Sequence, residues 1–159
     1  MDGIVVFADE NSILRTELFD EAKKVSTVGA VPVGILGDDD GTSESFLQAP
    51  SCDAAGKLVG YRVSEETVLP ANRGDMLLSS RLEWAGFVVN ARALWDDAKE
   101  RPEWVRDLGA IDDADARAAS PLALVTDPGR VEPLASCAQA ALAWSLRSDS
   151  LHDVKFPHE

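Results

Sequence analysis

The stretch that constrains the fold most strongly is Val31-Pro32-Val33-Gly34-Ile35-Leu36, an apolar run rich in β-branched residues. A short apolar run bounded by turn-forming residues is typical of a buried β-strand. Pro32 has no N–H to donate to a neighbouring strand, so we expect it near the start of the strand or at an edge of the sheet. The run therefore predicts a strand over residues 31–36.

Directly after this strand the composition changes to turn-forming residues. The chain continues Gly37-Asp38-Asp39-Asp40-Gly41-Thr42-Ser43-Glu44-Ser45, with only Phe46 and Leu47 as apolar anchors before Gly56. Such a composition is typical of a loop. We therefore expect a long acidic loop at residues 37–56, and loops of this length in a compact domain are often functional.

Further strands are expected on both sides of this segment. Apolar runs at residues 4–8, 86–90 and 121–125 and the alternating pattern at residues 57–63 each predict a strand. Between the first two strands, Asn11 or Ser12 is expected to cap a helix. One face of that helix carries Leu14, Leu18, Ala22 and Val25.

Helical spacing returns in the second half of the chain. A final helix is expected to begin near residue 131 and to carry Leu134, Cys137, Ala138, Ala141, Leu142 and Ser145 on its buried side. Shorter helices are expected at residues 91–99, 102–108 and 112–119.

The order of these elements predicts an α+β fold, with a single mixed or antiparallel sheet of about 4–6 strands and helices packed on it. A three-layer α/β fold is the alternative, and the lack of helices between the middle strands disfavours it. A chain of 159 residues has the usual size of one domain. We therefore expect a single globular domain over residues 1–159, with a loose C-terminal tail at residues 149–159.

The charge of the chain is strongly negative. The formal net charge is −13, and no Lys or Arg occurs between Val25 and Gly56. Such a surface repels phosphate backbones and anionic lipids, which disfavours a nucleic-acid or membrane partner. The apolar run at residues 4–8 is too short for a signal peptide or a membrane span, so a cytoplasmic location is expected.

The two cysteines are expected to be separate thiols. Cys52 falls in the acidic loop and Cys137 on the final helix, and structural disulfides are rare in a reducing cytosol. Cys137 is therefore interpreted as a small core residue. Neighbouring carboxylates raise the pKa of a thiol, which argues against a reactive nucleophile at Cys52.

The candidate site residues are the four carboxylates Asp38, Asp39, Asp40 and Glu44. Clustered carboxylates at the end of a strand can hold Mg²⁺ or Ca²⁺, but the spacing does not fit the calcium-binding loop pattern. A partner-facing acidic loop is the preferred functional interpretation. Trp104 flanks a charged stretch and is proposed as an interface anchor, because tryptophan is enriched at binding hot spots. No catalytic residue, bound metal or cofactor is predicted.

These features favour a non-enzymatic, acidic protein-binding module. By analogy of composition, it is expected to act as a bacterial immunity protein does, neutralising a basic partner such as a toxin domain through charge complementarity. One alternative is a divalent-metal-dependent hydrolase or phosphate-processing enzyme that uses the loop at Asp38–Asp40. Another is a subunit of a phage or secretion assembly, in which the charge keeps the free subunit soluble.

Overall fold

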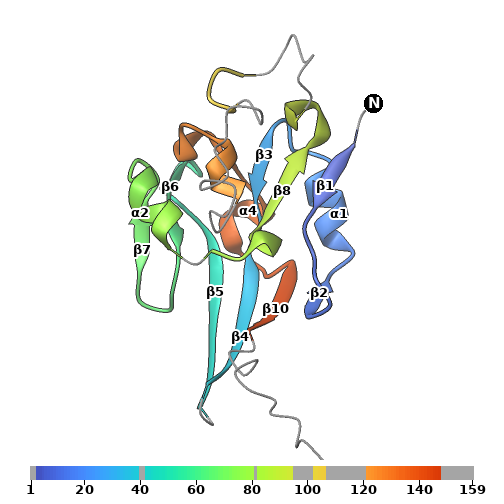
Figure 1. The fold of residues 1–159 in the computed structure, drawn as a ribbon, viewed down its shortest axis with the longest axis vertical. Helices are drawn as coiled ribbons and strands as arrows, with labels where there is room; N and C mark the ends of the chain where they lie inside the picture. The colour runs from blue at the N-terminus through green and yellow to red at the C-terminus, as the bar shows by residue number, and fades with distance from the viewer. Residues whose placement is uncertain (1–2, 40–41, 81, 95–101, 107–120, 148–159) are drawn as a thin grey trace, which may run out of the picture.

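The structure is a computed structural model that describes residues 3–39, 42–80, 82–94, 102–106 and 121–147. Within these residues the chain forms two β-sheets and three short α-helices (Figure 1). No helix of the described chain is long and apolar enough to span a membrane. The predicted helix at 112–119, residues 95–99 of the one at 91–99, and the tail at 149–159 lie outside the described residues. The helix predicted at 102–108 is wrong over residues 102–106, which form a turn and the bridge of Val105 to Val125.

The smaller sheet has four strands in the order β1-β8-β3-β9. Its members are β1 (Ile4–Val6), β8 (Phe87–Asn90), β3 (Val28–Ala30) and β9 (Glu132–Pro133). β8 pairs antiparallel with β1 and with β3, whereas β9 runs parallel to β3. β1 is therefore an edge strand of this sheet among the residues described.

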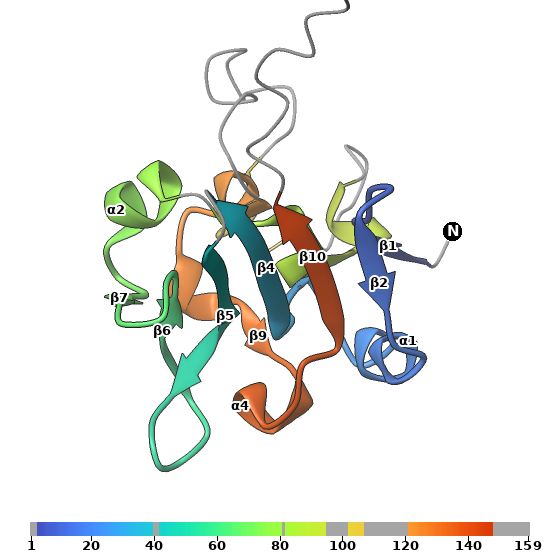
Figure 2. The ribbon, with the colours of Figure 1, turned by 90° about the horizontal axis from the view of Figure 1, so that it is seen from below.

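The larger sheet has six strands in the order β2-β10-β4-β5-β6-β7. They are β2 (Ser12–Leu14), β10 (Ala143–Arg147), β4 (Val33–Asp39), β5 (Thr42–Cys52), β6 (Leu58–Arg62) and β7 (Val68–Pro70). β10 pairs parallel with β4, and the other neighbours are antiparallel. In Figure 2, β2, β10, β4 and β5 lie side by side across this sheet.

The helical content is small. The α-helical segments are α1 (Glu17–Ala22), α2 (Gly74–Ser79) and α4 (Ala135–Ala138), and short 3-10 turns occur at η1 (Trp84–Gly86), η2 (Ala91–Leu94), η4 (Pro121–Leu124) and η5 (Pro128–Arg130). The prediction of one sheet covered by helices is therefore wrong. The predicted strand at 121–125 is mainly the 3-10 turn η4, and the first predicted helix begins instead as β2.

The predicted final helix is also wrong. Its alanine-rich sequence forms β9, α4 and β10 instead. In β10 the side chains alternate as in a strand: Ala143 and Ser145 are buried, and Trp144 and Leu146 are exposed. Small apolar residues recur at both the helical and the strand period here, so the local pattern did not separate the two structures.

The predicted acidic loop at 37–56 is largely a hairpin. β4 extends to Asp39 and pairs with β5 in the register Gly37↔Glu44, Asp38↔Ser43 and Asp39↔Thr42. Asp40 lies outside the described residues. The sequence of this polar stretch does not by itself favour a strand, but pairing with β4 provides partners for its backbone N–H and C=O groups. As a result, β5 is the longest strand of the described chain.

The main core lies between the two sheets. Phe87 and Val89 of β8 pack there with Leu58 and Tyr61 of β6 and with Leu122 of η4. The opposite face of β8 presents Val88, which packs against the α1 side chains Leu18 and Ala22. The smaller sheet is thus covered on both faces at β8, which explains why its central strands are apolar throughout.

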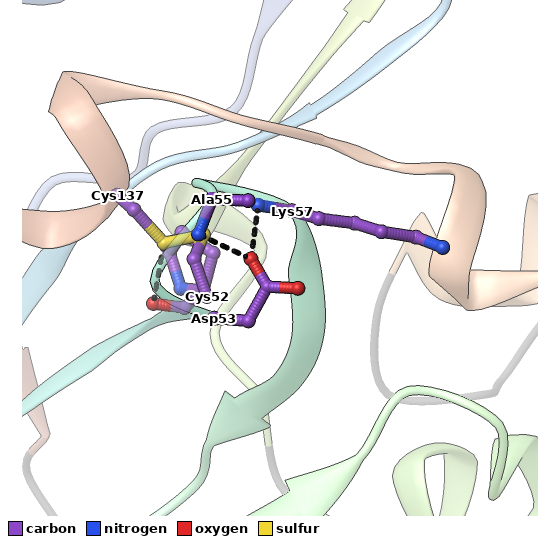
Figure 3. Close-up of a disulfide and its surroundings, with 6 residues drawn as sticks. Cys52, Asp53, Ala55, Lys57 and Cys137 are labelled. Carbon is purple, nitrogen blue, oxygen red and sulfur yellow. Dashed lines mark hydrogen bonds between the residues drawn. A yellow bond between two sulfur atoms is a disulfide. The ribbon is translucent and has the colours of Figure 1, made fainter.

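Cys52 and Cys137 form a disulfide, so the prediction of two separate thiols is wrong (Figure 3). The bond joins the end of β5 to α4. On the β5 side, Asp53 fixes the following turn, because its Oδ1 accepts from the N–H of Ala55 at 2.9 Å and of Lys57 at 3.0 Å. The pairing brings together residues that are 85 positions apart, which no local pattern indicated.

Candidate functional site

A cavity of about 390 Å³ opens where β1 ends. Its walls come from the end of β1, the start of β2, the η1 turn and β10. The lining residues are Val6, Phe7, Ala8, Asp9, Ser12, Glu83, Trp84, Ala85 and Ser145. We call this cavity the β1 pocket.

Strand pairing brings these distant segments together. Val6 pairs with Val88 across β1 and β8, and η1 leads directly into β8, so the end of β1 lies beside Glu83 and Trp84. On the other side, Ser12 pairs with Ser145 across β2 and β10. The pocket is therefore a product of both sheets.

A tight polar turn fixes Asp9, which lines the pocket. Its Oδ1 accepts from the Asn11 N–H and from the Ser12 hydroxyl, each at 2.9 Å, and the Ser12 Oγ accepts from the Asp9 N–H at 3.1 Å. Asp and Asn favour such turns because their short side chains bond nearby backbone groups. The carboxylate is thus oriented before any ligand arrives.

Glu83 is positioned through its backbone. The side chain of Gln48, which is only 4% exposed, accepts from the Glu83 N–H at 2.7 Å and donates to the Glu83 carbonyl at 3.0 Å. Gly86 makes room for this amide, because a Cβ at that position would overlap Gln48 Nε2. The η1 turn is therefore fixed to β5 of the larger sheet.

Two aromatic side chains form the apolar wall. The rings of Phe7 and Trp84 meet edge to face, with centroids 4.9 Å apart and an interplanar angle of 69°. Phe7 is half-buried against the main core, whereas Trp84 remains 40% exposed. The pocket thus combines two carboxylates, two hydroxyls and one accessible indole ring.

Of the residues predicted as a site from sequence, the structure describes the side chain of Trp104, which is not among the described residues that line this pocket. Asp38 and Asp39 lie in β4 and Glu44 in β5, where Asp38 pairs with Ser43 and Gly37 with Glu44. Trp104 is half-buried and packs against the main core. In the part of the chain that the structure describes, no three Asp, Glu, His or Cys side chains gather into a potential metal site.

Sequence reasoning missed Asp9, Glu83 and Trp84. The sequence predicts a helix that begins at Asn11 or Ser12, whereas the polar Asp9-Glu10-Asn11-Ser12 stretch directly after an apolar strand is itself a signal of a site at a strand end. Glu83 and Trp84 follow the apolar residues 76–78 and Leu82, whose spacing fits neither a helix nor a strand, and no local feature marks them as a site.

The whole of this pocket lies within a segment that matches a known family. The profile of glycosyltransferase family 43 matches residues 1–149. The chain belongs to glycosyltransferase family 43. The prediction of an immunity protein that binds a basic toxin domain is therefore wrong, and so are the bacterial origin and the basic protein partner that went with it.

Individual relatives agree with the family. The chain is 80% identical over 161 residues to a probable glucuronosyltransferase of Oryza sativa subsp. japonica, covering 100% of this chain and 36% of that protein. It is 35% identical over 184 residues to a beta-1,4-xylosyltransferase of Arabidopsis thaliana, covering 99% of this chain and 35% of the relative. The chain spans about a third of the length of these curated relatives.

A more distant similarity covers part of the chain. Galactosylgalactosylxylosylprotein 3-beta-glucuronosyltransferase 1 of Rattus norvegicus is 32% identical over 92 residues, which are 58% of this chain and 23% of the relative. Charge and composition favoured a protein-binding module over an enzyme. Carboxylates, however, bind basic protein surfaces and also accept hydrogen bonds from the hydroxyl groups of a substrate. The net charge alone does not separate these two uses.

Proposed function

We propose that this chain is the part of a family 43 glycosyltransferase that binds a sugar substrate in the β1 pocket during glycosyl transfer to a glycan. The observation that carries the proposal is the convergence of Asp9, Glu83 and Trp84 in one cavity inside the family match. The names of the relatives, glucuronosyltransferases and beta-1,4-xylosyltransferases, suggest the reaction class.

The chemistry of the pocket suits a sugar hydroxyl. A carboxylate accepts hydrogen bonds from hydroxyl groups, and such charge-assisted bonds are the stronger ones. In a transfer reaction, an acceptor hydroxyl forms a bond to the anomeric carbon of the donor sugar, the leaving group departs with its electron pair, and the hydroxyl proton passes to a base. Asp9 and Glu83 are the two carboxylates in the pocket that can accept a hydrogen bond from the acceptor hydroxyl or take its proton as the base.

The test is calorimetric titration of the chain with β-1,4-xylotetraose, because two relatives are named for beta-1,4-xylosyl transfer. We expect binding that weakens at least about tenfold in Asp9→Asn and in Glu83→Gln, the loss of about 1.5 kcal/mol per charged hydrogen bond. Glu66→Gln, an exposed carboxylate outside the pocket, is the matched control.

The proposal predicts wild-type affinity for the control and reduced affinity for both pocket variants. Equal affinity in all four proteins would place the sugar elsewhere, and the absence of any binding to the wild-type chain would overturn the proposed function itself. Circular dichroism of each variant checks that the fold is retained.

A further inference from the structure

The outer face of the larger sheet carries a group of exposed apolar side chains. Its members are Ile13 of β2, Leu36 of β4, and Trp144 and Leu146 of β10, and they are between 38% and 66% exposed. We call these four residues the sheet patch. Single exposed apolar side chains are ordinary on a protein surface, whereas a contiguous group indicates a surface that another molecule covers.

Strand register makes the sheet patch contiguous. Trp144 pairs with Ile13 across β10 and β2, and Leu146 pairs with Leu36 across β10 and β4. Directly paired residues point to the same face of a sheet, and so do residues two positions apart on one strand. The four side chains are therefore neighbours on one face, and Figure 2 shows their three strands side by side.

This face is flat at its centre. Trp144 pairs with Gly34 of β4, and its ring occupies the space that a Cβ at Gly34 would need. The indole ring therefore lies over the β4 backbone. The opposite face of the same strands is already covered, because Val33, Ile35 and Ala143 are buried in the core. A flat apolar face without a groove suits a second flat surface.

The charged residues lie beside the sheet patch and not within it. None of its four side chains is ionisable, whereas Asp38, Asp39 and Glu44 follow at one end, where Gly37 pairs with Glu44 next to the pair of Leu36 with Ser45. The centre of a protein–protein interface is depleted of charged residues, and its rim is polar. The sheet patch therefore has the composition of an interface centre.

The area of the sheet patch fits a dimer. At these exposed fractions it presents on the order of 400 Å² to solvent, within the range of about 300–600 Å² for the largest apolar patch of a monomer. Two copies packed patch to patch would remove about twice that area from water. Because roughly 56–65% of an interface is apolar, the total buried area would be roughly 1,200–1,400 Å², at the lower end of the standard size.

We propose that the sheet patch is the centre of a homodimer interface, in which a second copy of the chain packs its own sheet patch face to face about a two-fold axis. A flat apolar face is complementary to itself, and two aligned sheets pack well through such faces. The inference is independent of the proposed function, because none of the four residues is among the described residues that line the β1 pocket.

The acidic end of the hairpin sets the orientation of the two copies. Each chain carries a net charge of −13, so the copies repel each other at long range. With the two β4 strands antiparallel, the segments that contain Asp38, Asp39 and Glu44 lie at opposite ends of the dimer. This orientation keeps the like charges apart while the apolar centres meet.

Sedimentation velocity of the oxidised chain, over about 1–200 µM and in about 0.1 M and 1 M NaCl, tests the dimer. We expect a monomer–dimer equilibrium that is tighter in 1 M NaCl, because salt screens the repulsion between like charges and leaves the apolar contact. A chain that stays monomeric at every concentration in both salts would overturn the inference. Open-ended aggregation without a discrete dimer would also overturn it.

The location of the interface is tested with Leu36→Lys and Leu146→Lys. Each change places two lysines at the centre of a two-fold interface, so we expect dimerisation at least about tenfold weaker than in the wild type. Met76→Lys is the matched control, because Met76 lies on α2 outside the sheet patch, is 39% exposed and undergoes the same change of charge. It should dimerise as the wild type does.

Circular dichroism checks that the three lysine variants keep the fold, which is expected because all three positions are exposed. Equal dimerisation in the wild type and both patch variants would show that the sheet patch is not the interface. An equal loss in Met76→Lys would show the same.

Hydroxyl-radical footprinting of the wild type gives a second measurement that needs no substitution. Trp144 and Trp84 are 39% and 40% exposed, so they react to a similar extent in the monomer. We expect the oxidation of Trp144, read by mass spectrometry, to fall at least about threefold at concentrations that favour the dimer, because a fully covered interface centre excludes water. Trp84 should be unchanged. Protection of Trp84 without protection of Trp144 would contradict the proposed face.

Discussion

The buried side-chain amide of Gln48 bonds both backbone polar groups of Glu83, accepting from its N–H at 2.7 Å and donating to its carbonyl at 3.0 Å. Gln48 belongs to β5 of the larger sheet, whereas Glu83 precedes the η1 turn that leads into β8 of the smaller one. One side chain thus joins the two sheets at the wall of the β1 pocket.

We expect Gln48→Leu to lower the free energy of unfolding by about 2 kcal/mol or more, because both polar groups of Glu83 would lose their partner in a buried setting. The same change is expected to weaken xylotetraose binding by releasing the Glu83–Trp84 turn. Urea unfolding and calorimetry measure the two effects. Gln139→Leu, at an exposed position, serves as the control, and similar losses in both variants would contradict this role of Gln48.

Removing the disulfide is expected to destabilise the chain by about 2–4 kcal/mol, because the Cys52–Cys137 bond closes a long loop in the unfolded state. The variant with Cys52→Ser and Cys137→Ser should show a lower Tm than the oxidised wild type. A reductant should lower the Tm of the wild type toward that of the variant and leave the variant unchanged. If the reductant has no effect on the wild type, the two thiols are not bonded in solution.

The α4 turn is expected to be stabilised by glycine. Four consecutive residues, Ala135 to Ala138, have φ angles of 56°, 50°, 58° and 70°, in the left-handed region that costs a residue with a Cβ about 1–2 kcal/mol. Ala138→Gly should therefore raise the free energy of unfolding by about 1 kcal/mol. Ala140→Gly, which lies outside this run, should lower it by about 0.4–1 kcal/mol. Loss of stability in both variants would contradict the left-handed turn.

Tyr61 is expected to make stability fall at alkaline pH. Its hydroxyl donates to the Pro128 carbonyl at 2.6 Å, and burial, with a smaller contribution from the charge of Asp127, raises the pKa of the phenol far above its usual value of 10.0. The unfolded chain ionises near that usual pKa and the folded chain does not. The contribution of the protonated Tyr61 to the free energy of unfolding is therefore complete below about pH 10. It is lost progressively as the pH rises above that value.

Urea unfolding between pH 8 and pH 11 measures this dependence, and Tyr61→Phe is the matched variant. The free energy of unfolding of the variant should be about 1 kcal/mol lower at pH 8, because the Pro128 carbonyl loses its hydrogen-bond donor. Above pH 10, the stability of the variant should depend less on pH than that of the wild type. Tyr61 is the only tyrosine in the chain, so its ionisation is followed directly by ultraviolet absorbance. Titration of the folded protein at the usual pKa would refute the buried hydrogen bond.

Four of the five strands predicted from local patterns are present, whereas the run at 121–125 is mainly the 3-10 turn η4. β4 begins directly after Pro32, as the missing N–H of proline required, and the apolar runs at 4–8 and 86–90 contain β1 and β8. The alternating stretch at 57–63 contains β6. The cytoplasmic location stays a prediction, although a disulfide is more typical of oxidising compartments.

Elements whose structure depends on pairing were not predicted. Residues 42–45 are polar and gave a loop signal, but they are the first residues of β5 because β4 offers a partner along its whole length. Ala143 to Arg147 gave a helical signal, but they form β10 because they insert between β2 and β4. In both places the local preference was weak, and tertiary hydrogen bonding decided the outcome.

The sequence by itself determined where the apolar strands lie, where turns interrupt them, and that the surface is acidic, because these properties depend on residues within a few positions of each other. Only the tertiary structure decided that the strands form two sheets, that Cys52 meets Cys137, and that Asp9 shares a pocket with Glu83. The physical reason is that these contacts join residues tens of positions apart. They stabilise the fold only after both sheets have formed, so no local stretch of sequence reveals them.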